Sequence, residues 1–588
     1  MSIVSDYTAV LAYPDYAPGR WNADHALGTP VIVSYSFLTD ADLPRPSEVA
    51  FEPASVTALD GAQRLAFRQA TASYADTAGL VFVEVPSGSP AMIDVFAAND
   101  SSVAGFATIP TVEFGETDTG YVAFDMPGTW EPGSWPYFVV LHEIGHALGL
   151  KHPHEGSITL DPAIDDTART VLSYNSVYPY VTDLGPLDVE ALTHLYGAPL
   201  GPTGVMAEWN AAKARVDLVG SDADDVVIGP VGTTFWNAGG GDDLAIGRQG
   251  ADRMLGGMGA DTLHGGRGED VLNGNGEDDS LVGGDDDDTI FGGTGDDILD
   301  GGGWSDVLVG GLGDDMLLGD WGDDRLVGGG GMDRITGGIG ADTVLGGADA
   351  DVIDAGDEGD FARGQDGDDT VDGGRGDDLL TGDGGDDVMM GEDGDDRLFG
   401  GDGADRMSGG DGDDSLRGGD GDDVVTGGAG DDRVSGDLGD DRIDGEAGAD
   451  VLQGWGGDDV LTGGDGADVL IAGDDDDVLL GGADDDVLLG GRGADVLDGG
   501  AGDDTMSGGA GVDAFVFAGG ADRITDWDAE AIRFDAAALG LVGGEIDVVL
   551  AASRVEDDDL VFERAGAWRL TVEGAARAED VADHLVLV

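Results

Sequence analysis

An apolar residue recurs at every ninth position between Ala238 and Val516, and glycine or polar residues fill most of the positions between. The stretch divides without insertion into 31 nonapeptide units such as GGMGADTLH and GGDGDDVVT. The sixth position is always Asp, and the eighth is always apolar, as in Leu263 and Phe515. Six glycine-rich residues permit a turn with positive φ, and the last three alternate outward, inward and outward as a strand does. We predict half a coil per unit and two stacked parallel sheets with one inward side chain per strand.

Such a core is too thin to hold the coil alone. One buried aliphatic side chain stabilises by about 1.5–3 kcal/mol, whereas ordering the residues of one unit costs on the order of 10 kcal/mol. The sixth-position carboxylates line up along the turns, and calcium bound between neighbouring turns would convert their repulsion into cross-links. We predict about one calcium ion per unit, held by residues that include Asp243, Asp252, Asp261, Asp270, Asp279, Asp288, Asp297, Asp378, Asp387, Asp396, Asp414, Asp423, Asp432, Asp441, Asp459, Asp495 and Asp504.

Two other interpretations of the repeats are weaker. A disordered acidic tract would fit the low hydrophobicity and high charge. A solvated tail, however, has no reason to place an apolar residue at the eighth position of every unit. EF-hand calcium loops need flanking helices, which so many glycines prevent. The strict phase therefore favours a folded roll.

A different pattern marks residues 137–150, YFVVLHEIGHALGL, where apolar residues follow helical spacing. Val139, Leu141, Ile144 and Leu148 are the candidates for its buried face. We predict a helix here.

Two histidines lie within this helical stretch, and a third follows it. His142 and His146 are four residues apart and project from one helix face. Gly149 can end the helix and reverse the chain, so that His152 returns towards the first two imidazoles. Three neutral imidazoles with an open fourth position are typical of a catalytic zinc site. A bare H-E-x-x-H match is equally well explained by a structural histidine pair, but the extended spacing favours zinc.

Composition separates the chain into two parts, since only 15 of its 108 glycines lie in residues 1–199. The net charge of −94 excludes nucleic acid as a natural partner, because phosphate contacts need clustered Lys and Arg. Cysteine is absent, so disulfides and thiolate metal sites are unavailable. We expect a soluble chain, with no membrane span because no run of 18 apolar residues occurs. We also expect no Sec-type signal, because MSIVSDYTAVLAYPDY lacks a basic segment before an apolar one.

The zinc pattern resembles that of the metzincin peptidases, and with the repeats behind it the chain is similar to the serralysin subgroup. VIVSYSF at 31–37 resembles the family's first strand, and AFRQATASYADTAGLVFVEV resembles the helix and strand that follow. The resemblance implies an α+β metzincin-like catalytic domain followed by a long all-β parallel β-roll, the RTX solenoid. It also implies a substrate-aligning edge strand made by Gly105, Phe106, Ala107 and Thr108.

One residue departs from the family pattern. Metzincins place a methionine under the zinc in a tight turn, where TVLSYNS puts Leu172 in this chain. Leucine is similar in volume and equally apolar, and such a swap costs under ~1.5 kcal/mol, so zinc binding should survive. Tyr174 stands where serralysins carry a tyrosine that approaches the zinc.

Each residue of the predicted zinc site would have its own role in peptide hydrolysis. His142, His146 and His152 would hold a zinc ion that acidifies a bound water and polarises the scissile carbonyl. Glu143 would take the proton of the water and pass it to the leaving amine. The resemblance implies that Tyr174 donates a hydrogen bond to the oxyanion. Pairing of an extended peptide with the edge strand predicts an endopeptidase.

The nonapeptide is the pattern of the RTX calcium-binding β-roll. This resemblance implies export as an unfolded chain by type I secretion machinery, through an uncleaved C-terminal signal, to an extracellular site where calcium folds the repeats. The tail AEDVADHLVLV fits such a signal. The runs DAFVF and AIRFD predict strands that cap the open end of the roll.

We therefore expect four parts in the chain. They are a peptidase domain at 1–199 with 1–18 as a candidate leader or propeptide, a connector at 200–237 with a first partial repeat, the β-roll at 238–517, and a cap with the secretion signal at 518–588. Within the connector, GPVGTTFWN at 229–237 breaks the repeat pattern, and we expect it to pack between the roll and the first domain.

Two functions fit these parts. One is a secreted zinc endopeptidase acting on protein or peptide substrates, with a calcium-folded module for export and stability. The other is a structural or adhesive RTX protein, associated with a cell surface or surface layer, whose peptidase-like domain is weak or inactive. Glu143 and Tyr174 favour the enzyme, because a scaffold would need neither residue.

Overall fold

The computed structural model describes part of the N-terminal region and nearly all of the repeats. The described residues are 2–4, 31–37, 55–59, 61–75, 80–85, 87, 93–99, 105–107, 112–113, 116–117, 120–124, 139, 141–142, 144, 158–160, 205–230, 232–527, 531–534, 553–556, 559–564, 568–573, 575, 581 and 584–587. The chain divides into two compact units, Met1–Gly293 and Thr294–Val588. No helix among the described residues is long and apolar enough to cross a membrane.

The first unit begins with a mixed α+β part, as the sequence predicts. Its main sheet has the order β4-β2-β5-β9-β6, with β3 paired to β5. β2, β4, β5 and β9 run parallel, whereas β3 and β6 are antiparallel to their partners. The bounds are β2 (Val31–Phe37), β3 (Ser55–Thr57), β4 (Leu80–Val85), β5 (Ile93–Asn99), β6 (Gly105–Ala107) and β9 (Gly120–Phe124). Two short pairs are β1 (Ser2–Val4) with β10 (Ile158–Leu160) and β7 (Val112–Glu113) with β8 (Glu116–Thr117).

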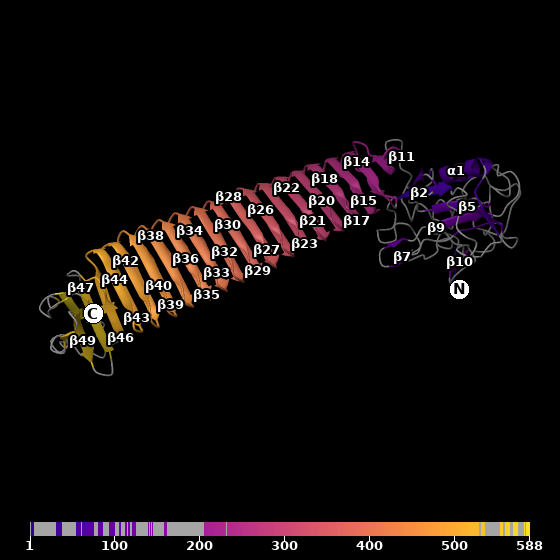
Figure 1. The fold of residues 1–588 in the computed structure, drawn as a ribbon. Coiled ribbons are helices and arrows are strands. Elements are labelled where there is room, and N and C mark those ends of the chain that lie inside the picture. Colours follow the sequence, from indigo (N-terminus) through magenta and orange to yellow (C-terminus); the bar gives the residue numbers. More distant parts are fainter. Residues whose placement is uncertain are drawn as a thin grey trace. The chain divides into compact units, whose positions relative to one another are not determined.

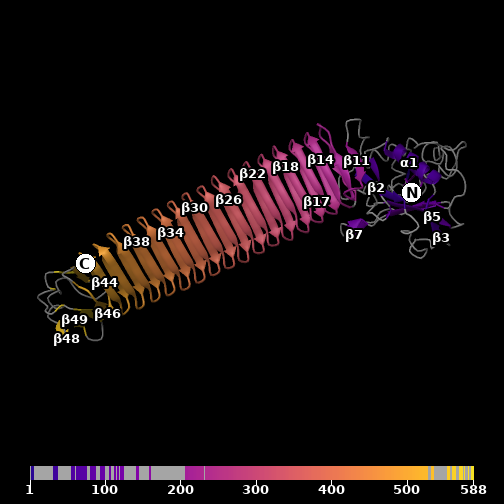
Figure 2. The same cartoon turned by 45° about the horizontal axis from the view of Figure 1, so that its top comes forward.

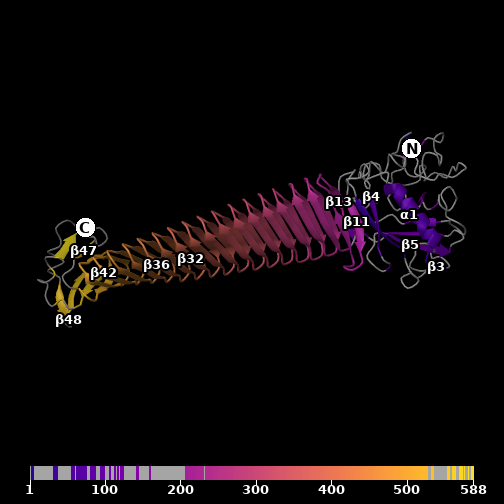
Figure 3. The ribbon, with the colours of Figure 1, turned by 90° about the horizontal axis from the view of Figure 1, so that it is seen from above.

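Helix α1 (Gly61–Ala75) lies beside the strands of this sheet (Figure 3). It packs on the sheet through one apolar stripe. Phe67, Ala70 and Tyr74 follow each other at helical spacing and are at most 1% exposed. The Phe67 ring lies 5.2 Å from that of Tyr35 and 5.6 Å from that of Phe37, both on β2. The strand and helix predicted from VIVSYSF and AFRQATASYA are thus confirmed.

In both units the repeats fold as a parallel β-solenoid, and strands alternate between two sheets. Figure 1 and Figure 2 show this stacking in the second unit, with turns along both edges. In the first unit the strands are β12 (Arg215–Val219), β13 (Val226–Ile228), β14 (Thr234–Gly240), β15 (Leu244–Gln249), β16 (Arg253–Met258), β17 (Thr262–Arg267), β18 (Val271–Gly276), β19 (Ser280–Asp285) and β20 (Thr289–Thr294).

The second unit continues the same alternation. One sheet holds β22 (Val307–Leu312), β24 (Arg325–Gly330), β26 (Thr343–Ala348), β28 (Phe361–Asp366), β30 (Leu379–Gly384), β32 (Arg397–Asp402), β34 (Ser415–Asp420), β36 (Arg433–Leu438), β38 (Val451–Gly456), β40 (Val469–Asp474), β42 (Val487–Gly493), β44 (Thr505–Gly511) and β46 (Gly520–Ile524). The other holds β21 (Ile298–Gly303), β23 (Met316–Trp321), β25 (Arg334–Ile339), β27 (Val352–Asp357), β29 (Thr370–Arg375), β31 (Val388–Asp393), β33 (Arg406–Asp411), β35 (Val424–Ala429), β37 (Arg442–Ala447), β39 (Val460–Asp465), β41 (Val478–Ala483), β43 (Val496–Ala501), β45 (Ala514–Phe517) and β47 (Ala531–Phe534).

The eighth position of each unit forms the predicted aliphatic core. Leu380 pairs with Leu398, and Leu398 pairs with Leu416 on the next strand of the same sheet. These three side chains are at most 2% exposed. One inward side chain per strand therefore stacks along the solenoid.

The strands are longer than predicted, because most have six residues rather than three. β16 runs through Gly256 and Gly257 to Met258 and alternates in burial along its length. Gly256 faces inward, where an added Cβ would lie 2.2 Å from the Asp261 carboxylate. The glycine at the first position of a unit is thus part of the strand. Because it has no side chain, it also leaves room for the aspartate five residues later.

The roll also begins before the predicted boundary. β11 (Met206–Asn210) forms an antiparallel hairpin with β12, and β12 pairs in parallel with β14. Thr234 takes the place of the sixth-position aspartate, and Trp236 fills the inward position with 1% exposure. Residues 232–237 therefore follow the coil despite their departure from the repeat pattern.

The last repeats end on a short antiparallel meander. β45 and β47, which contain the DAFVF and AIRFD runs, continue the coil in parallel instead of capping it. The meander is formed by β48 (Arg554–Glu556), β49 (Asp559–Arg564) and β50 (Trp568–Val572), and β50 also pairs with β46. β51 (Leu585–Leu587), from the predicted secretion tail, pairs with β47.

Candidate metal centres

The predicted zinc helix is helical at the four of its positions that the structure describes. Val139, Leu141, His142 and Ile144 are α-helical and at most 6% exposed. His142 therefore lies on a buried helix with apolar neighbours. The other residues of the predicted site lie outside the described residues: Glu143, His146, His152, Leu172 and Tyr174.

A hydrogen bond ties this helix to α1. The hydroxyl of Tyr74 donates to the carbonyl oxygen of Leu141 at 2.5 Å, and Tyr74 is fully buried. Leu141 directly precedes His142, so the position of the first predicted zinc ligand is linked to the helix that packs on the main sheet. The separation of 67 positions between the partners hides this link from sequence analysis.

Removing the Tyr74 hydroxyl should loosen the zinc helix. We expect Tyr74→Phe to destabilise the peptidase domain by about 1–3 kcal/mol, because the deletion leaves a buried carbonyl without this donor. The measurement is chemical denaturation followed by the loss of activity. Tyr35→Phe is the matched control, because it removes the hydroxyl of another buried tyrosine, whose bond to Glu84 is longer, at 3.3 Å. Equal effects of the two changes would contradict the anchoring role.

The predicted substrate strand lies at the end of the main sheet. Gly105, Phe106 and Ala107 form β6, which follows β9 in the strand order. Thr108 lies outside the described residues. Within the part of the chain that the structure describes, the second edge of β6 has no partner strand, as β-strand addition by a peptide requires. The substrate-aligning role of these residues stays a prediction.

The sixth-position aspartates form buried ladders along the solenoid. Every one that we singled out as a calcium ligand is at most 2% exposed. The backbone N–H of Asp378 donates to Oδ1 of Asp396 at 2.8 Å, and that of Asp396 donates to Oδ1 of Asp414 at 2.8 Å. One carboxylate oxygen thus links each coil to the coil 18 residues earlier.

The second carboxylate oxygen of each ladder aspartate is the group that a bound cation would neutralise, although no cluster of three or more His, Cys, Asp or Glu side chains among the described residues could hold a metal ion. Within the described part of the chain, Oδ2 of each sixth-position aspartate from Asp315 to Asp495 is buried without a hydrogen-bond partner. A Cβ added to Gly391 would lie 2.2 Å from Oδ2 of Asp396 and 2.5 Å from the Gly409 carbonyl oxygen. Carboxylate and carbonyl oxygens from neighbouring coils therefore converge, and such oxygens are the ligands that calcium prefers.

A second ladder was not predicted. Fifth-position aspartates are exposed, and their Oδ1 atoms accept hydrogen bonds from the backbone of the following coil. The N–H of Asp395 donates to Asp377 at 3.1 Å, and that of Asp413 donates to Asp395 at 3.0 Å. The frequent Asp at the fifth position was the sequence signal for this ladder.

Burial makes the inner carboxylates weak acids in the absence of a cation. Desolvation raises the pKa of Asp378 to about 6, of Asp396 to about 7 and of Asp522 to about 8. Backbone hydrogen bonds oppose this rise, and neighbouring carboxylates add to it. The calcium-free coil therefore favours protonated aspartates, whereas calcium needs the ionised form.

This gives the calcium-free repeats an unusual pH dependence. Because the pKa values are raised above the unfolded value of about 3.9, these groups stabilise the coil below about pH 4 and lose that contribution as the pH rises through about 6–8. We expect the β-structure signal in circular dichroism, with EGTA present, to fall from pH 4 to pH 8. A calcium-free signal that grows over this range would contradict the buried ladder.

Comparisons with known proteins match both a peptidase domain and the calcium-binding repeats. Residues 34–197 match the family model described as matrixin. Nine segments between residues 237 and 524 match the RTX calcium-binding nonapeptide repeat. The predicted resemblance to a serralysin-like metzincin with RTX repeats is therefore confirmed.

Three individual proteins are similar to parts of this chain. The chain is 27% identical over 236 residues to serralysin of Photorhabdus laumondii, covering 36% of this chain and 47% of that protein. It is 28% identical over 263 residues to serralysin of Proteus mirabilis, covering 38% and 51%. A segment of 90 residues is 40% identical to a probable matrix metalloproteinase of Invertebrate iridescent virus 3, covering 15% and 20%. The chain spans about half the length of the serralysins that it matches.

Proposed function

We propose that this chain is a secreted, zinc-dependent endopeptidase whose repeat region folds by binding calcium. The observation that carries the proposal is the buried helical position of His142, the first residue of the H-E-x-x-H-x-x-G-x-x-H pattern. The matrixin match over residues 34–197 and the serralysin relatives support the same activity.

The residues of this pattern supply three imidazoles and a carboxylate. His142, His146 and His152 would hold the zinc, whose chemistry is to acidify a bound water and polarise a carbonyl. Glu143 accepts a proton from the attacking water and returns it to the leaving amine. Tyr174 donates a hydrogen bond to the oxygen that gains charge as the carbonyl carbon becomes tetrahedral. The edge of β6 that has no partner among the described strands would align an extended substrate, so cleavage falls within a chain.

Through calcium, the repeats would make folding of the chain depend on whether it lies inside or outside the cell. Where calcium is scarce, the carboxylate ladders repel and the chain remains unfolded, as passage through a type I exporter requires. Outside the cell, calcium at about 10⁻⁴–10⁻³ M, the range of extracellular modules, would neutralise the ladders and fold the coil. The burial of the sixth-position aspartates supports this part of the proposal.

The experiment that tests the function is hydrolysis of casein or gelatin by the full-length, calcium-loaded protein. We expect cleavage at internal peptide bonds, its loss with a zinc chelator, and its return when zinc is added back. A properly folded chain that holds zinc but cleaves neither protein would sink the proposal and favour a structural or adhesive role.

A further inference from the structure

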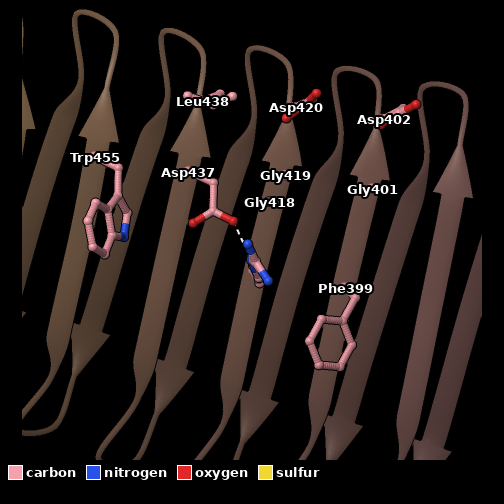
Figure 4. A pocket seen from close by; sticks show the side chains of 10 residues that line it. Phe399, Gly401, Asp402, Gly418, Gly419, Asp420, Asp437, Leu438 and Trp455 are labelled. Atoms are coloured by element: carbon pink, nitrogen blue, oxygen red, sulfur yellow. Dashed lines mark hydrogen bonds and ion pairs between the residues drawn. The ribbon is translucent and has the colours of Figure 1, made fainter.

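An open groove crosses the outer face of one sheet of the solenoid in the second unit. It lies over the neighbouring strands β32, β34, β36 and β38. Phe399 and Trp455 stand at its two ends, and Leu438 lies near the strand ends (Figure 4). These three side chains are 39%, 60% and 59% exposed, and they line the same hollow. We call this hollow the aromatic groove.

The strand register fixes the layout of the aromatic groove. Phe399 pairs with Arg417 across β32 and β34, and Asp437 pairs with Trp455 across β36 and β38. The two aromatic rings therefore belong to strands three positions apart, about 14 Å at the usual strand spacing. Gly419 lies beside Asp437 and leaves the floor between them open. An extended ligand running across the strands can contact both rings.

A fixed ion pair lies between the two rings. The Arg417 guanidinium donates to the Asp437 carboxylate, and the Ser435 hydroxyl also donates to this carboxylate at 2.7 Å. Figure 4 marks the ion pair at Asp437 by a dashed line. Only 17% of the Asp437 side chain is exposed, whereas 63% of that of Arg417 is. The groove thus offers ordered hydrogen-bond donors and acceptors between its aromatic ends.

The backbone conformation at Trp455 is unfavourable for a residue with a side chain. Trp455 occupies the second position of its unit, where Asp437 stands in one neighbouring coil of the sheet and Gly473 in the other. Its φ is 81°, in the region that favours glycine. Its exposed indole adds no core packing in return. A strained, exposed tryptophan therefore suggests a role outside the coil.

The side chains that line the aromatic groove indicate which kind of ligand it can bind. Flat aromatic faces accept the apolar faces of sugar rings, and the ion pair can exchange hydrogen bonds with sugar hydroxyls. Asp402 and Asp420 also line the groove, so an anionic glycan would be repelled. We propose that the aromatic groove binds a neutral polysaccharide and holds the protein on a carbohydrate matrix. This binding is independent of the proposed peptidase activity.

The test uses the full-length, calcium-loaded protein with laminarin, dextran, amylose and galactomannan as probes. We expect at least one of them to bind in isothermal titration calorimetry. Trp455→Gly should weaken that binding at least about tenfold, as loss of a central aromatic anchor does. This change restores glycine at a position of positive φ, so the coil should fold at the same calcium concentration or a lower one.

Asn275→Gly is the matched control. Asn275 occupies the same second position on β18, with a φ of 81°, but lies far from the groove along the chain. It should leave polysaccharide binding unchanged. The proposal fails if none of the four glycans binds, if Trp455→Gly and the wild-type protein bind equally, or if a cationic peptide but no glycan competes for the groove.

Discussion

Glu143→Ala is expected to lower kcat/KM for casein hydrolysis by about 10²–10⁴-fold, the usual contribution of general acid–base catalysis. The imidazole ligands remain, so the protein should still bind zinc. The change therefore separates catalysis from metal binding, which a histidine substitution cannot do. Activity is measured on the full-length, calcium-loaded chain, and its zinc content on the same sample.

Glu208→Ala provides the control for this substitution. Glu208 is an exposed residue on β11, outside the proposed catalytic residues, and its loss should leave kcat/KM unchanged. If Glu143→Ala retained full activity with zinc bound, Glu143 would not be the base. The mechanism would then have to use another carboxylate.

Calcium removal is expected to have the largest structural effect. The ladder aspartates are buried, and from Asp315 to Asp495 the second oxygen of each is without a partner among the described residues. Without a cation at neutral pH, charge repulsion and desolvation oppose the coil, whose core is one aliphatic residue per unit. Circular dichroism at neutral pH should therefore show the gain of β-structure with millimolar calcium and its loss with EGTA.

A single coil provides a sharper version of this test. Asp369 is 1% exposed and accepts the Asp351 N–H at 2.8 Å, whereas Asp366, three residues earlier, is exposed. Asp369→Ala should raise the calcium concentration at the folding midpoint and broaden the transition, because stability in a solenoid depends on neighbouring coils. Asp366→Ala should change neither. An equal response of both variants would show that the sixth-position aspartates have no special part in folding.

The solenoid could be predicted from the sequence because the residues that specify it recur every nine positions. Leu263 is inward and Asp261 is buried, as the nonapeptide requires. The six-residue strands were missed because Gly256 reads as a turn residue, and its spacer role depends on the carboxylate of Asp261. Thr234 likewise looked like a break, yet its N–H and hydroxyl both donate to Asp252 and replace the missing ladder residue.

Relations between distant residues could not be predicted in the same way. The histidine spacing indicated the zinc helix, but the bond from Tyr74 to Leu141 depends on tertiary packing. The aromatic groove also has no local signal, since Phe399 and Trp455 line one hollow only through the register of stacked coils. The nine-residue period thus predicted the solenoid. The bond from Tyr74 to Leu141 and the aromatic groove depend instead on residues that are distant in the sequence and close in space.

The zinc content of the full-length, calcium-loaded protein tests the central claim most directly. Elemental analysis after dialysis should find a single zinc per chain, and His146→Ala should lose it while the β-structure of the repeats persists. A correctly folded chain without zinc, or a His146→Ala variant that keeps it, would contradict the account.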